Sequence, residues 1–94
     1  MTNERATELI YAALTDINAE RGSAPGVALA AQTALLGNAG VLDSLELVSF
    51  IANLEGRLSE ELAKPVLIVN EEAFDGHVFR DVASLAAHLV RLDA

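Results

Sequence analysis

Apolar residues recur at the spacing of an α-helix in three separate stretches of this 94-residue chain. Positions i, i+3, i+4 and i+7 lie on one face of a helix, and the first such stripe consists of Ala6, Leu9, Ile10, Ala13, Leu14 and Ile17. The second consists of Leu47, Val48, Ile51, Leu54, Leu58 and Leu62, and the third of Val82, Leu85, Ala86, Leu89 and Leu92. A helix with one apolar face must bury it against other elements. The repeats therefore predict a small all-α bundle.

The ends of the first and third helices are marked by residues that favour such positions. Thr2 or Asn3 can cap the first helix with a side-chain oxygen, and Gly22 provides a stop after it. We therefore expect this helix over residues 3–21. Asp81 is a good cap for the third helix, which should follow it directly.

The second helix is expected over residues 44–62. Pro65 ends the pattern, because proline lacks the backbone N–H that a helix interior needs. Gly56 lies inside the helix at a cost of about 1 kcal/mol relative to alanine, but the apolar spacing continues beyond it. Two further apolar residues, Leu45 and Phe50, fall away from the centre of the stripe.

The two connections between these helices differ in character. Residues 22–42 contain glycines, a proline and an asparagine, so we expect a long loop there. The apolar residues expected to pin this loop to the core are Leu35, Leu36, Val41 and Leu42. Residues 66–69 are apolar but have no second strand to pair with, so we expect an extended segment packed on the helices. A short helical turn can follow over residues 70–74, which makes residues 1–94 one domain of three main helices and a minor one.

Charge and the absence of cysteine exclude several classes of function. Fourteen acidic residues against six lysines and arginines give a formal charge of −8. Nucleic acid and anionic membranes are therefore poor partners, because both require clustered positive charge. A basic protein surface suits such a chain, although the acidity could equally serve solubility alone. Without cysteine there is no disulfide, no zinc–thiolate site and no cysteine nucleophile.

The sequence also contains no pattern for export or membrane insertion. The amino-terminal stretch MTNERATELIYAAL carries acids among its apolar residues, unlike a signal peptide. No apolar stretch approaches the roughly 18 residues that a membrane span needs. We therefore expect a cytoplasmic protein.

Residues that could support catalysis or bind a metal form no recognisable arrangement. No serine lies in a G-x-S-x-G elbow, and His77 and His88 do not have the spacing of a zinc site. His88 falls opposite the stripe that contains Leu85 and Leu89, which predicts a solvated surface residue. We expect no catalytic residue, no metal site and no enzymatic activity.

Asp43 and Ser44 stand at the expected start of the second helix and have two interpretations. Asp43 is a favoured cap, and Glu46 three positions later completes a capping-box pattern. Ser44, however, follows a long loop and lies where backbone N–H groups and the helix dipole favour a phosphate. The pair therefore fits both a simple helix cap and a site of covalent modification.

At these residues the chain resembles the acyl carrier protein family, whose hallmark is Asp-Ser-Leu, here Asp43-Ser44-Leu45, opening the second helix after a long loop. The stretch LLGNAGVLDSLELVSFIANLE over residues 35–55 is also similar, as is VFRDVASLAAHL over residues 78–89, so that the resemblance covers essentially the whole chain. It implies a four-helix bundle of the acyl-carrier type with 4′-phosphopantetheine on Ser44.

The same resemblance implies a function and a set of partners. A phosphopantetheinyl transferase would attach the arm from coenzyme A. A ligase or synthetase would then load an acyl, aminoacyl or peptidyl group on its thiol, and a downstream synthase or transferase would receive that group. The sulfur that the chain lacks would arrive with the cofactor. The protein would be a monomer and would catalyse nothing itself.

The second helix would be the surface on which these enzymes dock. The residues expected to contact them are Glu46, Val48, Ser49 and Glu55. Arg57 departs from an acidic face, which favours secondary-metabolite or specialised lipid synthesis over primary fatty-acid synthesis. An alternative from another class is an unmodified acidic helical adaptor that binds a protein partner and uses Asp43 and Ser44 only as a cap.

Overall fold

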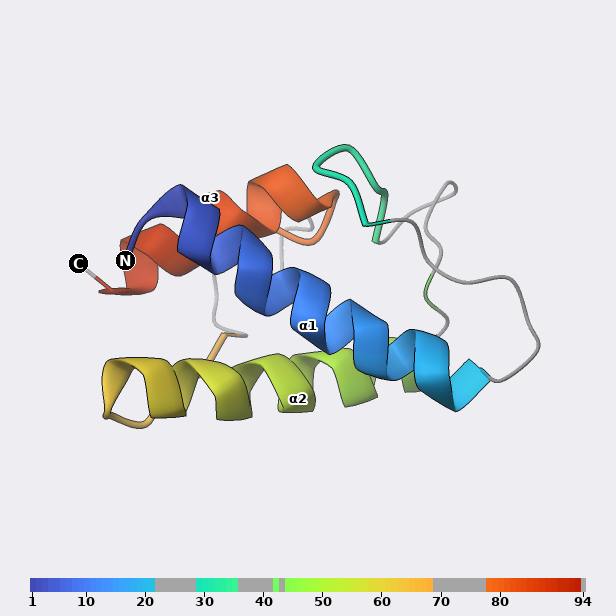
Figure 1. Cartoon of the computed structure of the whole chain (residues 1–94), viewed down its shortest axis with the longest axis horizontal. Helices are drawn as coiled ribbons and strands as arrows, with labels where there is room; N and C mark the ends of the chain where they lie inside the picture. Colours follow the sequence, from blue (N-terminus) through green and yellow to red (C-terminus); the bar gives the residue numbers. More distant parts are fainter. Residues whose placement is uncertain (22–28, 36–41, 43, 69–77, 94) are drawn as a thin grey trace.

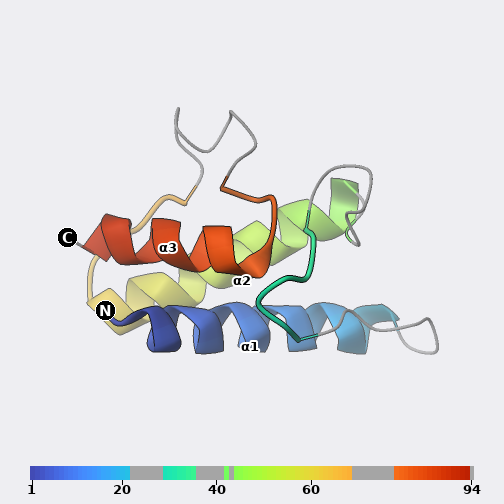
Figure 2. The same cartoon turned by 90° about the horizontal axis from the view of Figure 1, so that it is seen from above.

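The computed structural model describes residues 1–21, 29–35, 42, 44–68 and 78–93, and these contain three α-helices and no strand. The helices are α1 (Asn3–Arg21), α2 (Ser44–Leu62) and α3 (Val82–Asp93). α1 and α2 run antiparallel, and α3 runs beside α1 in the direction of α2, so that α1 begins and α3 ends at the same end of the molecule (Figure 1). Seen from above, α3 lies over α2 and alongside α1 (Figure 2). The expected boundaries of α1 and α2 and the expected start of α3 are confirmed.

α1 is the helix against which both others pack, and its apolar face forms the centre of the core. All six residues of its predicted stripe are buried. Four of the five stripe residues of α3 are buried as well, and Leu92 is partly buried against them. The apolar residues that helical spacing assigned to the buried faces of α1 and α3 are therefore buried or partly buried.

The buried face of α2 differs from the predicted stripe at two positions. Phe50, which the spacing placed off centre, is completely buried, whereas Val48 is 66% exposed. Side chains at positions i and i+2 of a helix are separated by about 200° around its axis, so Val48 and Phe50 point to nearly opposite sides. The buried row consists of Phe50, Leu54 and Leu58, at successive i+4 positions, with Leu47 and Ile51 partly buried beside it. The side of α2 that contains Phe50, its largest apolar residue, therefore faces the core.

The starts of α1 and α3 are satisfied by capping hydrogen bonds. The Arg5 N–H donates to Thr2 Oγ1 at 3.0 Å, which makes Thr2 the cap of α1. At α3 the Ser84 N–H donates to Asp81 Oδ1 at 2.8 Å, as expected. The N–H groups of Val82 and Ala83 donate to carbonyls of the 29–35 segment, which docks on the start of α3. Backbone groups that a helix end leaves unpaired are thus satisfied by the connecting loop.

The connecting segments are anchored in the core by some of their apolar residues, whereas Leu67 is 75% exposed. Leu35 and Leu42 are buried in the core, while Leu36 and Val41 lie outside the described residues. Residues 66–68 form no helix or strand and contribute the fully buried Ile68 to the core. The short helix expected over residues 70–74 lies outside the described part of the chain, so the four-helix count stays a prediction.

The carboxyl end of α2 contains an alanine where a glycine is favoured. Ala63 has φ 55°, the left-handed conformation, and the Lys64 N–H donates to the Ser59 carbonyl at 3.2 Å in the manner of a Schellman turn. Gly56, by contrast, lies inside the helix, and a Cβ there would meet nothing within 4 Å. Glycine therefore stands at position 56, where alanine is favoured, and alanine stands at position 63, where glycine is favoured.

We expect both Gly56→Ala and Ala63→Gly to stabilise the domain, each by roughly 0.5–1 kcal/mol. Alanine restricts the unfolded chain at position 56, and glycine removes the left-handed penalty at position 63. Urea denaturation of the two variants and of the double variant tests this. Because the sites are seven residues apart, the two gains should add. A loss of stability in either single variant would contradict the interpretation.

The carboxyl group of Asp81 gives the fold a predictable response to acid. Its hydrogen bond from the Ser84 N–H, assisted by the Ser84 hydroxyl and Arg80, holds the pKa of Asp81 below its usual value. A lowered pKa in the folded state stabilises the fold above the unfolded value of about 3.9, and this contribution is lost as the pH falls through the folded value.

We therefore expect the free energy of unfolding to fall between about pH 5 and pH 3. The fall should be shallower in Asp81→Asn, because asparagine still caps the helix but does not titrate. Asp16 and Glu61, whose pKa values are also lowered by hydrogen bonds, would retain part of the slope. Urea denaturation at several pH values measures it, and an unchanged slope in Asp81→Asn would contradict this account.

Candidate functional site at the start of α2

The backbone of α2 begins at Ser44, the serine of the Asp-Ser-Leu motif. Leu42, two residues earlier, is only 8% exposed and anchors the incoming chain in the core. The first N–H groups of a helix have no partner within it and form its positive end. Ser44 therefore stands at the positive end of a 19-residue helix. Asp43 and the Ser44 side chain lie outside the described residues, so the choice between cap and modification site stays a prediction.

The first two turns of α2 present apolar side chains that nothing in the described structure covers. Leu45 is 80% exposed and Val48 is 66% exposed, and Ser49 and Ala52 are exposed too. Positions i, i+3, i+4 and i+7 lie on one side of a helix, and we call these four residues the outer face of α2. Burying a side chain the size of valine or leucine yields about 1.5–3 kcal/mol. Two such side chains left exposed one turn apart make the outer face a candidate contact surface.

The other two predicted docking residues, Glu46 and Glu55, are not part of the outer face. Glu46 is partly exposed in the first turn of α2. Glu55 is also partly exposed, and its Oε1 accepts a hydrogen bond from the Ile68 N–H at 3.0 Å. The structure therefore brings Val48 and Ser49 together beside Leu45, whereas the Glu55 carboxylate holds the segment that follows α2.

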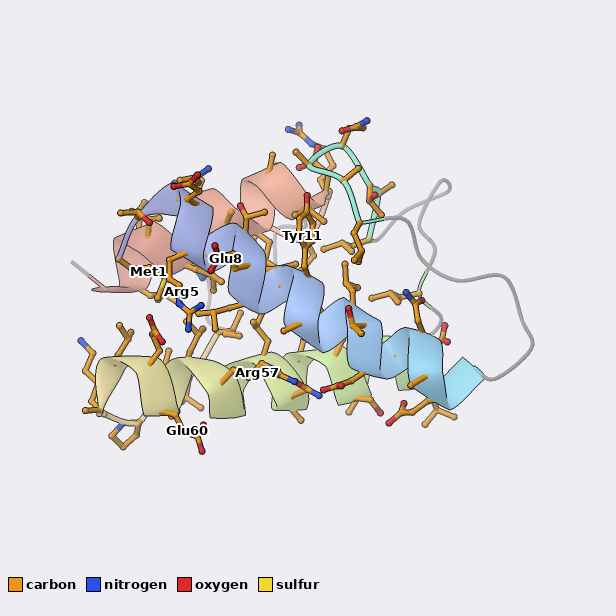
Figure 3. The ribbon with its side chains drawn as sticks, in the orientation of Figure 1. Met1, Arg5, Glu8, Tyr11, Arg57 and Glu60 are labelled. Atoms are coloured by element: carbon orange, nitrogen blue, oxygen red, sulfur yellow. The ribbon has the colours of Figure 1, made fainter. Side chains whose placement is uncertain are left out.

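Arg57, which the sequence placed among the acids of α2, is directed toward α1. Its Nη2 lies 2.6 Å from Asp16 Oδ2, and its Nε donates to Asn53 Oδ1 at 2.7 Å. Figure 3 shows Arg57 reaching between the two helices, as Arg5 does nearer the start of α1. Arg5 binds Glu61 through two hydrogen bonds of 2.8 Å. The charge of Arg57 therefore serves the α1–α2 contact and does not interrupt the outer face.

His88 is buried, so the prediction of a solvated surface residue was wrong. Only 1% of it is exposed, and its Nε2 lies 3.2 Å from the carbonyl oxygen of Ile68. Since a carbonyl can only accept, Nε2 must carry the proton and donate it. Nδ1 has no hydrogen-bond partner within the described ranges. The signal for burial was the position of His88 at the edge of the stripe, because Leu85 and Leu92 of that stripe stand at i−3 and i+4 from it.

Ile68 is thus held from both sides, its N–H by Glu55 of α2 and its carbonyl by His88 of α3. Both polar groups of this buried residue are satisfied by side chains, because no neighbouring strand is present among the described residues to pair with them. The Ile68 clamp, formed by these three residues, links two helices whose main packing is against α1.

We expect Glu55→Ala to cost about 1–3 kcal/mol, because it leaves the buried Ile68 N–H without an acceptor. Glu55→Gln should recover much of this loss, since its amide oxygen still accepts. The matched control is Glu60→Ala, an exposed acid on the same helix, whose effect should stay within about 0.5 kcal/mol. Urea denaturation gives the free energies, and faster exchange of the Ile68 amide would locate the effect. Equal losses in the two alanine variants would contradict the clamp.

Two searches for other kinds of site are negative within the described ranges. No three histidine or acidic side chains come together in a way that could hold a metal ion. None of the three described helices is long and apolar enough to cross a bilayer.

Comparison with protein-family models, with curated proteins and with solved structures finds no match to this chain. The interpretation of the site therefore rests on its own residues and geometry.

Proposed function

We propose that this chain is a carrier protein that holds an acyl, aminoacyl or peptidyl group as a thioester on a 4′-phosphopantetheine arm attached to Ser44. The observation that carries the proposal is the start of α2 at Ser44, directly beside the exposed Leu45 and Val48. A carrier needs a hydroxyl that an enzyme can reach and a surface that successive enzymes can recognise. The motif serine and the outer face of α2 would supply these at one end of one helix.

The chemistry asked of this chain is limited to one substitution at phosphorus. The Ser44 oxygen would form a phosphodiester with the arm of coenzyme A, the remainder of coenzyme A would leave, and the hydroxyl proton would pass to the transferase. The new phosphodiester would carry a negative charge at the positive end of α2, where the helix dipole stabilises it. The thiol of the arm would then carry the cargo, and this chain would contribute position and recognition but no catalytic group.

The outer face would be shared by the enzymes that modify, load and unload the arm. Exposed apolar residues beside the attachment point offer a contact that does not depend on the cargo. Because Arg57 pairs with Asp16, its charge no longer argues against any class of cargo. Arg57 was the reason for favouring secondary-metabolite or specialised lipid synthesis, so the proposal is a monomeric, cytoplasmic carrier in which primary fatty-acid synthesis is equally open.

An intact-mass measurement tests the proposal directly. The apo chain is incubated with coenzyme A and a broad-range phosphopantetheinyl transferase, beside a control carrier. The chain should gain the mass of one arm, and fragmentation should place the gain on Ser44. If the control is modified and this chain is not, the proposal fails and the unmodified adaptor becomes the better interpretation. A gain located on another residue would also overturn the assignment to Ser44.

A further inference from the structure

The outward side of α3 contains a hollow lined by two arginines. It has a volume of about 240 Å³, and the described residues that line it are Val78, Arg80, Ser84, Ala87 and Arg91. Ser84, Ala87 and Arg91 stand at i, i+3 and i+7 in one row of α3, and Arg80 precedes the helix by two residues.

The charge of the hollow is opposite to that of the chain. The sequence has 14 acids and only six lysines and arginines. Arg5 and Arg57 are bound to carboxylates of neighbouring residues. The hollow combines two of the remaining cations, and no acid is among its described lining residues. Both arginines line the same hollow, and an anion bound there would be attracted by both.

The guanidinium groups of the hollow keep N–H donors that a ligand could use. Arg91 is exposed and makes no hydrogen bond or ion pair with any residue that the structure describes. Arg80 is 69% exposed; its Nη2 donates to Ser84 Oγ at 3.2 Å, and its Nε lies 3.6 Å from Asp81 Oδ2. That carboxylate already accepts the Ser84 N–H.

We propose that this hollow binds the phosphate group of a small molecule. A guanidinium group binds phosphate oxygens through paired N–H donors. A water occupies about 30 Å³ of liquid, so the hollow has room for a phosphate in place of several waters. The small side chain of Ala87 leaves the space between the two arginines open. The proposal is independent of Ser44 and can be tested on the unmodified chain.

The test is a titration of the apo chain, labelled with ¹⁵N, with inorganic phosphate and with pyrophosphate. Sodium chloride of equal ionic strength serves as the reference. Saturable shifts should appear at the amides of Ser84, Ala87 and Arg91, with tighter binding of pyrophosphate. Arg91→Gln should weaken binding about tenfold, as expected for the loss of a charge-assisted contact. Arg91→Lys should recover only part of it, because lysine cannot form the paired contact.

Lys64→Gln is the matched control, because it removes an exposed positive charge that does not line the hollow. Binding by this variant should stay within about twofold of the parent chain. The proposal is overturned if the shifts are no larger than those with sodium chloride, or if Lys64→Gln weakens binding as much as Arg91→Gln. Saturable binding of a glutamate-rich peptide without binding of pyrophosphate would also overturn it, and would assign the hollow to an acidic protein partner.

Discussion

Phe50→Ala is expected to reduce the free energy of unfolding by about 3–5 kcal/mol, the usual cost of removing a buried phenyl group. Phe50 is completely buried in the row of α2 that also contains Leu54 and Leu58. Domains of this size have only about 5–15 kcal/mol of stability in total. The variant should therefore unfold at a much lower urea concentration and could be partly unfolded without urea.

Val48→Ala provides the matched control, since it also shortens an apolar side chain of α2. Val48 is 66% exposed, so we expect a change within about 0.5 kcal/mol. The apolar spacing alone predicted the opposite order of burial, with Val48 in the stripe and Phe50 off its centre. The pair of urea midpoints therefore measures which side of α2 faces the core. Similar losses in the two variants would mean that α2 is rotated relative to the arrangement described here.

The helices could be predicted from the sequence because their signals are local. Thr2, Asp81 and Pro65 mark ends through effects that act within one turn, and the apolar period shows which positions can be buried together. The rotation of α2 could not be predicted in this way. Its apolar residues cover a wide arc, and contacts with α1 select the part of that arc that is buried.

His88 was misassigned for a related reason. A single stripe describes a helix that packs against one neighbour, but α3 contacts both α1 and the segment that contains Ile68. The second contact widens its buried face, and a polar residue is accepted there because the Ile68 carbonyl pairs with Nε2. The partner of His88 is 20 residues away in the sequence, and no local pattern connects the two.

In the candidate site, too, some features follow from local sequence signals and others depend on the fold. The start of α2 at Ser44 could be predicted from the motif and the break in periodicity. Its surroundings required the fold, because the exposure of Leu45 and Val48 depends on which side of α2 faces α1. The roles of Glu55 and Arg57 were also decided by residues outside α2, namely Ile68 and Asp16.

Ser44→Ala is expected to abolish attachment of phosphopantetheine completely while leaving the fold intact. The substitution removes the only atom of this residue that can form the phosphodiester, so no modified fraction should remain. As the first residue of α2, Ser44 can contribute at most about 1 kcal/mol through capping. Circular dichroism and urea denaturation should therefore give a folded protein close to the parent, and the intact-mass assay should show no gain.

Ser49→Ala tests whether attachment of the arm requires Ser44 itself or only an intact docking surface. Ser49 lies five residues later on the outer face of α2 and is exposed, so its loss perturbs the surface but leaves the motif unchanged. This variant should gain the full mass of the arm. Loss of modification in both variants would mean that the assay reports contact with the transferase and not the site of attachment. Unfolding of Ser44→Ala would instead make Ser44 a structural cap, and the case for a carrier would lose its central residue.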